Sequence, residues 1–186
     1  GEWAAAEGLV YDFFGPELVQ PVPESLDGPW YISCDYGTVN PTSMGLWGQK
    51  GGVWYRTAEF YYDSRKTGRQ QTDGEYADDL ARLAGGRDIR GVVLDPSAAS
   101  FREELIRRGW TVYRAENEVL SGIRRTAELL RAGQLVVCAP CGDAIREFGL
   151  YRWDTAATGD RVVKEHDHAM DDIRYFAVTV AGRRSE

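Results

Sequence analysis

The sequence has no long hydrophobic run and no excess of positive charge. None of its apolar stretches approaches the roughly 18–20 residues that a membrane-spanning helix needs, and we expect no secretion signal. Acidic residues outnumber basic ones by 29 to 22, which gives a net charge of −7 at pH 7. A domain that binds nucleic acid by itself usually has the opposite balance, because phosphate contacts need lysine and arginine. The charge argues against tight DNA binding by this chain alone, but it leaves room for DNA chemistry at carboxylates that hold metal cations.

Cysteines and nucleotide-binding motifs are also scarce. The three cysteines, Cys34, Cys138 and Cys141, are too few for a disulfide framework in a chain of 186 residues, which favours a reducing compartment. Cys138 and Cys141 have the spacing of a redox pair. We expect ordinary buried thiols instead, because the pair comes late in the chain and no second pair completes a zinc site. No G-x-x-x-x-G-K-[ST] motif occurs, so we expect any ATP-driven motor to lie outside this chain.

The residues that are present are typical of one folded domain. Hydrophobic residues make up 43% of the chain, and six Trp, ten Tyr and six Phe supply large areas for burial. Residues 1–29 contain four of the seven prolines, so we expect an extended arm there rather than a helix. We expect the folded domain to occupy residues 30–186.

Hydrophobic periodicity predicts strands first, then helices alternating with strands. The expected strands are 30–35, 43–49, 53–62, 91–95, 110–113 and 135–138, with a Gly-Gly hairpin turn at 51–52. The expected helices are 72–84, which opens with a capping box, 98–105, 119–130 and 167–180. A second hairpin is expected from 150–153 and 161–164. This order predicts an α/β fold with a mixed sheet and helices on its faces.

Two acidic residues stand at the ends of expected strands. Asp35 ends the first strand, and Asp95 ends the strand that follows the first helix. If these strands are parallel neighbours, the two carboxylates meet at the sheet edge where open α/β sheets place their sites. Such carboxylates repel, so the pair persists by sharing a proton or by binding a divalent cation such as Mg²⁺ or Mn²⁺. The alternative, in which both acids only cap turns or helices, is equally favoured by the spacing.

The last expected helix begins with an unusual group of polar residues. Both histidines of the chain, His166 and His168, lie here beside Asp167, Asp171 and Asp172. At helical spacing, His168, Asp171 and Asp172 share the face opposite the apolar residues. A His and an Asp three residues apart can share a metal or hold a water. The alternative is a solvated polar face, which the spacing alone slightly favours.

Several motifs occur in a characteristic order along nearly the whole chain. In sequence they are Asp35-Tyr36-Gly37 with Asn40-Pro41-Thr42, Glu59-Phe60-Tyr61-Tyr62 leading to Thr72-x-x-Glu75, Leu94-Asp95-Pro96, Val119-x-x-Gly122, and Asp167-His168-Ala169-Met170-Asp171-x-x-Arg174-Tyr175. Taken together they resemble the C-terminal nuclease domain of phage large terminase subunits, which has the RNase H-like fold. The final motif is the most specific piece. The early Glu7-Gly8-Leu9-Val10-Tyr11 looks like the segment that joins this family's ATPase domain to its nuclease.

The resemblance implies a metal-dependent endonuclease that cuts concatemeric viral double-stranded DNA during genome packaging, by two-metal phosphodiester hydrolysis. The family's catalytic acids correspond to Asp35, Asp95 and Asp171, which would hold two divalent cations, Mg²⁺ or Mn²⁺, with Asp35 shared between them. Its active-site histidine corresponds to His168. The position after the last acid is commonly Ala in the family and is Asp172 here. The third metal ligand is therefore Asp171, favoured by its place in the motif, or Asp172.

The resemblance also implies partners and a location. Residues 1–29 would follow an ATPase motor domain of the same polypeptide, and DNA, the portal and the small terminase subunit would be partners in the cytoplasm of the infected bacterial host, with no membrane involved. Arg161 and Lys164, on the expected second hairpin, would flank the cleft and guide DNA. Two alternatives stay open: a non-catalytic domain of the same fold that docks DNA or portal, and a resolvase-like or integrase-like nuclease.

Overall fold

A computed structural model describes residues 7–156 and 158–183. They form a seven-stranded sheet with the strand order β1-β7-β4-β3-β2-β5-β6. The antiparallel pairs are β2–β3 and β3–β4, and the other neighbours are parallel, so β3 alone runs against the rest. The strands are β1 (Val19–Gln20), β2 (Asp27–Asp35), β3 (Thr42–Lys50), β4 (Val53–Tyr62), β5 (Ile89–Leu94), β6 (Val112–Arg114) and β7 (Leu135–Cys138).

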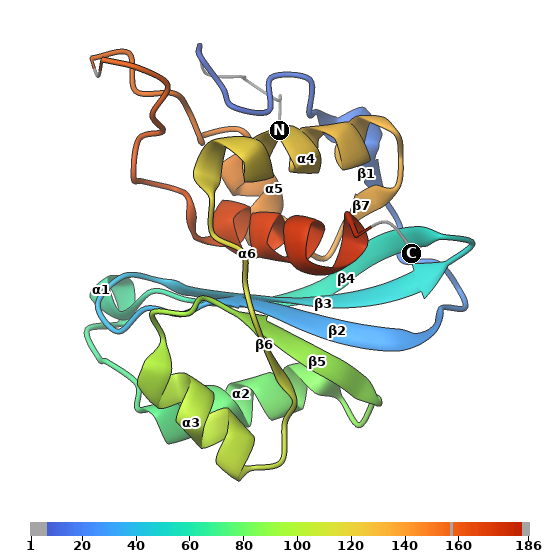
Figure 1. Cartoon of the computed structure of the whole chain (residues 1–186), viewed down its shortest axis with the longest axis vertical. Helices are drawn as coiled ribbons and strands as arrows, with labels where there is room; N and C mark the ends of the chain where they lie inside the picture. Colours follow the sequence, from blue (N-terminus) through green and yellow to red (C-terminus); the bar gives the residue numbers. More distant parts are fainter. Residues whose placement is uncertain (1–6, 157, 184–186) are drawn as a thin grey trace.

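Helices cover both faces of this sheet (Figure 1). Helices α2 and α3 lie on one face, and α4, α5 and α6 lie on the other, with α6 directly against the strands. The helices are α1 (Ser64–Thr67), α2 (Asp73–Ala84), α3 (Ala99–Arg107), α4 (Val119–Arg131), α5 (Gly142–Phe148) and α6 (His168–Phe176). The predicted mixed sheet with flanking helices is confirmed. None of the described helices combines the length and apolar character needed to cross a membrane.

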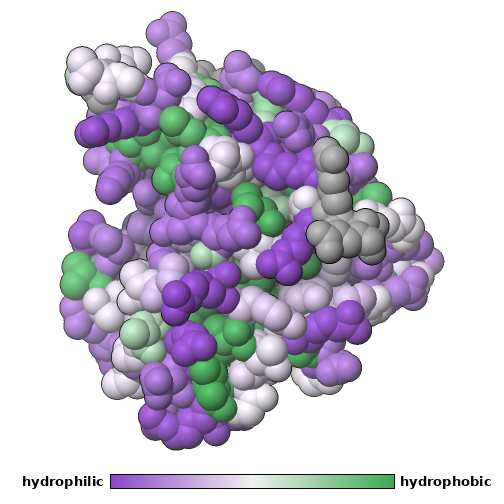
Figure 2. All heavy atoms as spheres, viewed as in Figure 1, coloured by the Kyte–Doolittle hydropathy of each residue, from purple (hydrophilic) through white to green (hydrophobic). Residues whose placement is uncertain are grey.

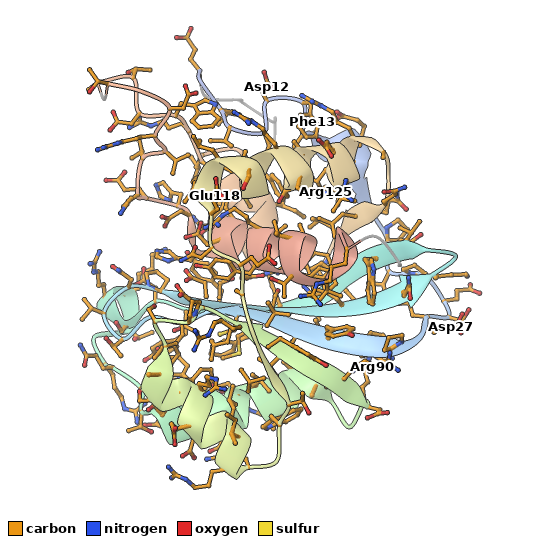
Figure 3. The ribbon with its side chains drawn as sticks, in the orientation of Figure 1. Asp12, Phe13, Asp27, Arg90, Glu118 and Arg125 are labelled. Atoms are coloured by element: carbon orange, nitrogen blue, oxygen red, sulfur yellow. The ribbon has the colours of Figure 1, made fainter. Side chains whose placement is uncertain are left out.

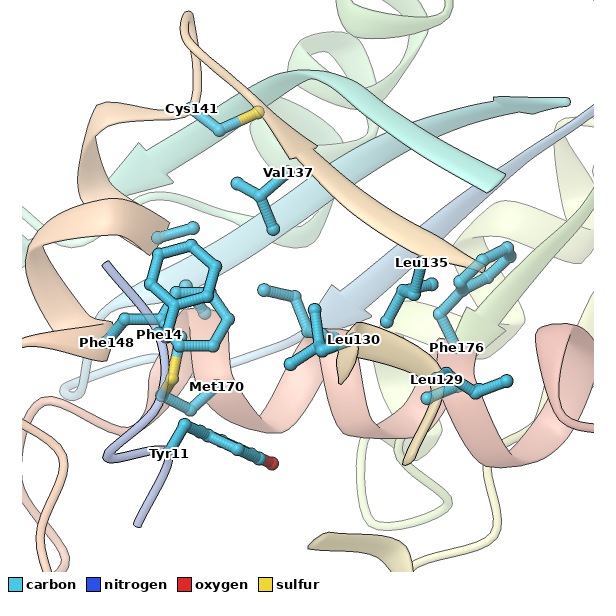
Figure 4. Packing of buried hydrophobic residues seen from close by; sticks show 14 of the residues in the cluster. Tyr11, Phe14, Leu129, Leu130, Leu135, Val137, Cys141, Phe148, Met170 and Phe176 are labelled. Atoms are coloured by element: carbon cyan, nitrogen blue, oxygen red, sulfur yellow. The ribbon is translucent and has the colours of Figure 1, made fainter. Parts of the chain in front are cut away.

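Each face of the sheet has its own hydrophobic core. Below β2 and β5, Tyr76, Leu80 and Phe101 from α2 and α3 are completely buried. The core under α4–α6 contains large aromatic side chains (Figure 4). There the Phe14 and Phe148 rings stack with centroids 3.8 Å apart, an arrangement worth about 0.5–1.5 kcal/mol beyond the buried area. The two cores hold α6 and the strand ends in fixed positions.

Local sequence signals explain where several elements begin and turn. The predicted capping box starts α2, where the Thr72 hydroxyl accepts a hydrogen bond from the Glu75 backbone N–H and the Glu75 carboxylate reaches back to the Thr72 N–H. Gly51 and Gly52 have φ values of 57° and 78°, which glycine adopts readily, and they form the predicted β3–β4 turn. Helix α1 was not predicted from the sequence, because four residues are too few to establish a helical period.

The first segment of the chain is more than an arm outside the domain. Tyr11 and Phe14 are buried in the core beneath α4 and α5, and Val19–Gln20 pairs with β7 as an edge strand. Strand β2 also begins at Asp27, earlier than the expected start at Trp30. Pro16 starts a single 3-10 turn (Pro16–Leu18), the other described residues up to 29 are not helical, and aromatic burial fastens the segment to the domain. A preceding ATPase domain stays a prediction.

The region between α5 and α6 contains less regular structure than predicted. The two arms of the expected hairpin meet at a single antiparallel bridge between Trp153 and Val162. Ala157, in the expected hairpin loop, lies outside the described residues. The last helix divides into α6 and a π-helical turn at Ala177–Ala181. Arg125 of α4 donates a hydrogen bond to the Gly182 carbonyl (2.9 Å) and so ties α4 to the end of this turn (Figure 3).

Candidate active site

A cleft opens at the carboxyl ends of the central parallel strands. Cys34 of β2 pairs with Leu94 of β5, so Asp35 and Asp95 leave the sheet side by side, and the predicted parallel pairing is confirmed. The cleft has a volume of about 650 Å³. Figure 2 shows the surface hollowed between the segment that precedes α6 and the region of α1. The acidic and histidine side chains that line it are Asp35, Asp63, Asp95, Glu165, His166, Asp167, His168 and Asp171.

Helix α6 brings the two remaining predicted site residues to this cleft. It packs across β2 and β3, with His168 and Asp171 one turn apart near its start. The His168 Nδ1 atom lies 3.1 Å from Oδ2 of Asp35. The structure therefore brings Asp35, Asp95, His168 and Asp171 into one cleft, as the sequence predicted, although their chemical roles stay predictions.

Side chains of α6 also orient two of these carboxylates. The Tyr175 hydroxyl donates a hydrogen bond to Oδ2 of Asp95 (3.1 Å). The Arg174 guanidinium donates to Oδ1 of Asp171 (3.2 Å) and to the side-chain oxygen of Asn117 (3.3 Å). Such contacts fix the direction in which a carboxylate presents its oxygens.

The cleft concentrates negative charge on carboxylates that are largely, but not completely, buried. Burial raises the pKa of Asp35 well above its usual range, and the negative charges of Asp172, Asp167 and Asp95 raise it further. Burial likewise raises the pKa of Asp171, as does the charge of Asp35, while Arg174 opposes the shift. A divalent cation would relieve this repulsion.

Asp172 points away from the cleft. Its side chain is completely buried against the sheet, where it accepts hydrogen bonds from the hydroxyls of Ser33 (2.7 Å) and Ser43 (2.5 Å) and forms an ion pair with Arg56. The expectation that Asp172 shares a polar face with His168 is wrong. Helix α6 is covered on both sides, by the sheet and by α4 and α5, so a polar residue on its inner side needs a buried partner.

The start of α6 is held by a side chain from another helix. Oε1 of Glu147, on α5, accepts hydrogen bonds from the backbone N–H groups of Ala169 (2.8 Å) and Met170 (3.2 Å), and the Tyr61 hydroxyl donates to Oε2 (2.6 Å). Asp167 occupies the N-cap position of α6, but its side chain makes no capping hydrogen bond. Its Oδ1 is buried without a hydrogen-bond partner in the described part of the chain and lies 3.5 Å from Nε2 of His168. No sequence signal pairs Glu147 with α6, because the two elements meet only in the fold.

Cationic side chains line the same cleft. Lys164, predicted to guide DNA, is among its lining residues, whereas Arg161 is not. Arg65 and Lys66 of α1, together with Arg146 of α5, also line it. The sequence did not predict these three residues as part of the site, because isolated basic residues are common on protein surfaces.

The cysteine pair has the environment of buried thiols. Cys138 and Cys141 are both buried and free. Burial raises the pKa of Cys138 to about 11 and that of Cys141 to about 12. A reactive thiol needs a lowered pKa, so these values favour the interpretation as core residues.

The donor types in the cleft fit a hard divalent cation. Carboxylate oxygens are the ligands that Mg²⁺ and Mn²⁺ prefer, and the crowded negative charge of Asp35 and Asp171 favours cation binding. Within residues 7–156 and 158–183, no three His, Cys, Asp or Glu side chains form a compact metal-binding group. The fit therefore lies in the chemistry and charge of the cleft rather than in a preformed coordination shell.

Comparison with known proteins finds the same fold in large terminases of bacteriophages. The chain is 42% identical to the large terminase of a thermophilic bacteriophage whose structure in complex with ADP matches 97% of this chain with a TM-score of 0.90. The P22 large terminase nuclease domain matches with a TM-score of 0.74 at 18% identity, covering 93% of this chain and 92% of that one. The large terminase nuclease of the thermophilic phage G20c, with bound magnesium, matches with a TM-score of 0.69 at 16% identity, covering 93% and 98%.

A sequence relative agrees with these structures. The large terminase subunit of Escherichia phage T5 is 24% identical over 134 residues, which are 68% of this chain and 31% of that protein. No protein-family model matches the chain. The chain spans only 46% of the terminase solved with ADP, so it corresponds to part of such a protein. These matches show that the chain has the RNase H-like fold of the large terminase nuclease domains and is similar, over almost its whole length, to part of a large terminase.

Proposed function

We propose that this chain is a metal-dependent endonuclease that cuts concatemeric viral double-stranded DNA during genome packaging. The observation that carries the proposal is the meeting of Asp35, Asp95, Asp171 and His168 in one cleft at the carboxyl ends of β2 and β5. The likeness to the ADP-bound terminase and to the T5 terminase supports the packaging context. The magnesium and cobalt bound by the G20c nuclease support a divalent cation.

In this proposal the carboxylates of Asp35, Asp95 and Asp171 would hold two divalent cations. When bound, the cations would stabilise negative charge on the scissile phosphate and lower the pKa of a water. Asp171 is preferred to Asp172 as a ligand, because the Asp172 oxygens already accept hydrogen bonds from Ser33, Ser43 and Arg56. His168, beside Asp35, orients the attacking water or accepts its proton.

The surrounding residues set the geometry of this reaction. Tyr175 and Arg174 hold Asp95 and Asp171 in place through single hydrogen bonds. Glu147 fixes the first turn of α6, from which His168 projects. Rigid support of this kind keeps reacting groups within the small tolerance that phosphodiester hydrolysis requires.

The rest of the packaging machinery would supply the DNA. An ATPase domain of the same polypeptide, the portal and the small terminase subunit are the proposed partners, in the cytoplasm of the infected bacterium. A net charge of −7 suits a nuclease whose substrate is delivered by a motor rather than captured from solution. Low intrinsic affinity would also protect DNA from premature cutting.

A plasmid assay tests the proposal. Supercoiled plasmid is incubated with the chain and Mg²⁺ or Mn²⁺, and nicked and linear products are measured for the native chain and for Asp35→Asn. Asp63→Asn is the matched control. Asp63 lines the same cleft, but its carboxylate caps α1 by accepting the Arg65 backbone N–H (3.0 Å), and Asn caps equally well.

We expect cutting by the native chain and by Asp63→Asn, with loss in Asp35→Asn and in EDTA. Equal cutting by Asp35→Asn would exclude Asp35 as a metal ligand. Absence of cutting by the native chain with either cation would favour a non-catalytic docking domain. Preferential cutting of branched DNA would favour a resolvase-like enzyme.

A further inference from the structure

Two of the chain's three lysines lie at the cleft. Lys66 comes from α1, at the end of β4, and Lys164 comes from the segment that precedes α6. Figure 1 shows α1 at the end of the sheet and this segment above the sheet, leading into α6, and both contribute residues to the cleft. The third lysine, Lys50, ends β3 in the hairpin and is not among the cleft residues. A cleft lined by carboxylates thus has one lysine on each side.

These two lysines differ from several arginines on and beside α2 and α3, although other surface cations in the described residues, Lys50 among them, also form no ion pair. On α2 and α3, the guanidinium groups of Arg82, Arg107 and Arg108 form ion pairs with neighbouring carboxylates. Lys66 and Lys164 have exposed side chains and form no ion pair within the described part of the chain. An unpaired cation attracts a polyanion more strongly than a neutralised one. The acidic chain therefore keeps unpaired positive charge beside its candidate active site.

Helix α1 is fixed firmly enough to hold a cation in place. Asp63 caps its first turn, and the Ser64 hydroxyl donates to the Val39 carbonyl (3.0 Å). Arg65 donates to the side-chain oxygen of Asn40 (3.0 Å). A four-residue helix is unstable by itself, so these bonds to the β2–β3 connection are what hold it. They keep Lys66 at the edge of the cleft beside the Asp35 end of β2.

We propose that α1 forms a second phosphate-binding wall of the cleft, with Lys66 contacting the DNA backbone across from Lys164. The proposal rests on the proposed function, because it takes double-stranded DNA as the ligand. Arg65 contributes to the same wall, since its guanidinium retains donors beyond the one bonded to Asn40. Contacts of this kind position a duplex over the carboxylates without reading its sequence.

Salt-dependent DNA binding tests the second wall. A short fluorescent duplex of arbitrary sequence is titrated with the full chain in EDTA, where cutting cannot interfere, over a series of salt concentrations. We expect Lys66→Gln and Lys164→Gln each to weaken binding and to lower the salt-dependence slope by about 0.9, the value for one lost phosphate contact. In the double variant the two reductions should add. Lys50→Gln carries the same charge change away from the cleft and should bind like the native chain.

The outcomes separate this proposal from the endonuclease assignment. Weakened binding by Lys66→Gln supports the wall whether or not the plasmid is cut, because the binding assay needs neither cation nor catalysis. If Lys66→Gln binds like Lys50→Gln while Lys164→Gln binds weakly, DNA contacts one side of the cleft and the proposal is overturned. Equal effects of all three variants, or no binding even at the lowest salt, would also overturn it. Thermal melting of each variant confirms that these exposed substitutions leave the fold intact.

Discussion

Arg56 and Asp172 form an ion pair with no exposure to solvent, 116 residues apart in the chain. Arg56 lies on β4 and Asp172 on α6, so the pair joins the helix that carries His168 and Asp171 to the centre of the sheet. Hydroxyl donors from β2 and β3 complete the shell of Asp172. The pair thereby defines which side of α6 faces the sheet, and the neighbouring Asp171 is left to face the cleft.

We expect Asp172→Ala to destabilise the domain by up to roughly 3–5 kcal/mol, because it removes one of the two carboxylates that neutralise the buried Arg56 guanidinium and leaves only Glu59 (3.3 Å). Urea unfolding followed by circular dichroism measures this free energy. Asp171→Asn is the matched control at the adjacent position, and it should not lower stability, because Asp171 lies in a region of excess negative charge. Equal losses in the two variants would contradict the different roles given to these residues.

Asp35→Asn should stabilise the domain at neutral pH in the absence of divalent cations. The pKa of Asp35 is raised in the folded state, so the stability linked to its protonation is present below the unfolded value and is lost as pH rises through the folded value. The amide of Asp35→Asn does not ionise, so the variant does not lose this stability as pH rises. Melting temperatures in EDTA across a pH series should show a gap between the variant and the native chain that widens as pH rises. A gap that is constant with pH would contradict the prediction.

Divalent cations should reverse that difference. A ligand that binds only the folded state adds stability in proportion to the logarithm of its concentration, about 2.7 kcal/mol at 100 times its Kd. Mg²⁺ or Mn²⁺ should therefore raise the melting temperature of the native chain and of Asp63→Asn, but not that of Asp35→Asn, with EDTA restoring the starting value. An equal rise in Asp35→Asn would show that the cation binds elsewhere.

The side chains of Asp167 and Glu147 both lie at the start of α6, but we expect only Glu147 to stabilise the helix. The N-cap position of Asp167 would suggest the reverse. Asp at an N-cap position is worth about 0.5–2 kcal/mol when its carboxylate caps the helix, but Asp167 makes no such bond. We expect Asp167→Ala to change stability little. Glu147→Ala should cost about 1–3 kcal/mol or more, because it leaves the buried N–H groups of Ala169 and Met170 unpaired. Urea unfolding of both variants decides the point, and a larger loss in Asp167→Ala would contradict it.

Local and long-range features differ in how far the sequence predicts them. Asp35 and Asp95 each follow a short buried run, so their place at the strand ends could be predicted from neighbouring residues alone. Helical periodicity places Asp172 on the polar face with His168 and Asp171, and nothing local reveals its burial, because its partner Arg56 lies on a distant strand. The same limit applies to Glu147, whose contacts with α6 exist only after α5 and α6 have packed. Tyr11 and Phe14 show it again, since prolines in their segment suggested an arm although the aromatic rings belong to the core.

Tyr175 offers a test of how closely the cleft geometry controls cutting. Its hydroxyl donates to Asp95 from the buried side of α6, and its ring packs against Val93 and Ala115. Tyr175→Phe keeps the ring and removes only the hydrogen bond, so the fold should persist while the Asp95 carboxylate is held by the Ser97 N–H alone and is less well oriented. Loss of a residue that orients a metal ligand typically lowers metal affinity or activity 10–100-fold. Plasmid cutting should fall by this factor, with partial recovery at higher Mn²⁺ if the loss is in cation affinity. Cutting at the native rate would mean that Asp95 needs no support from α6, and that the Ser97 backbone N–H, which donates to the other Asp95 oxygen (3.0 Å), is enough to orient the carboxylate.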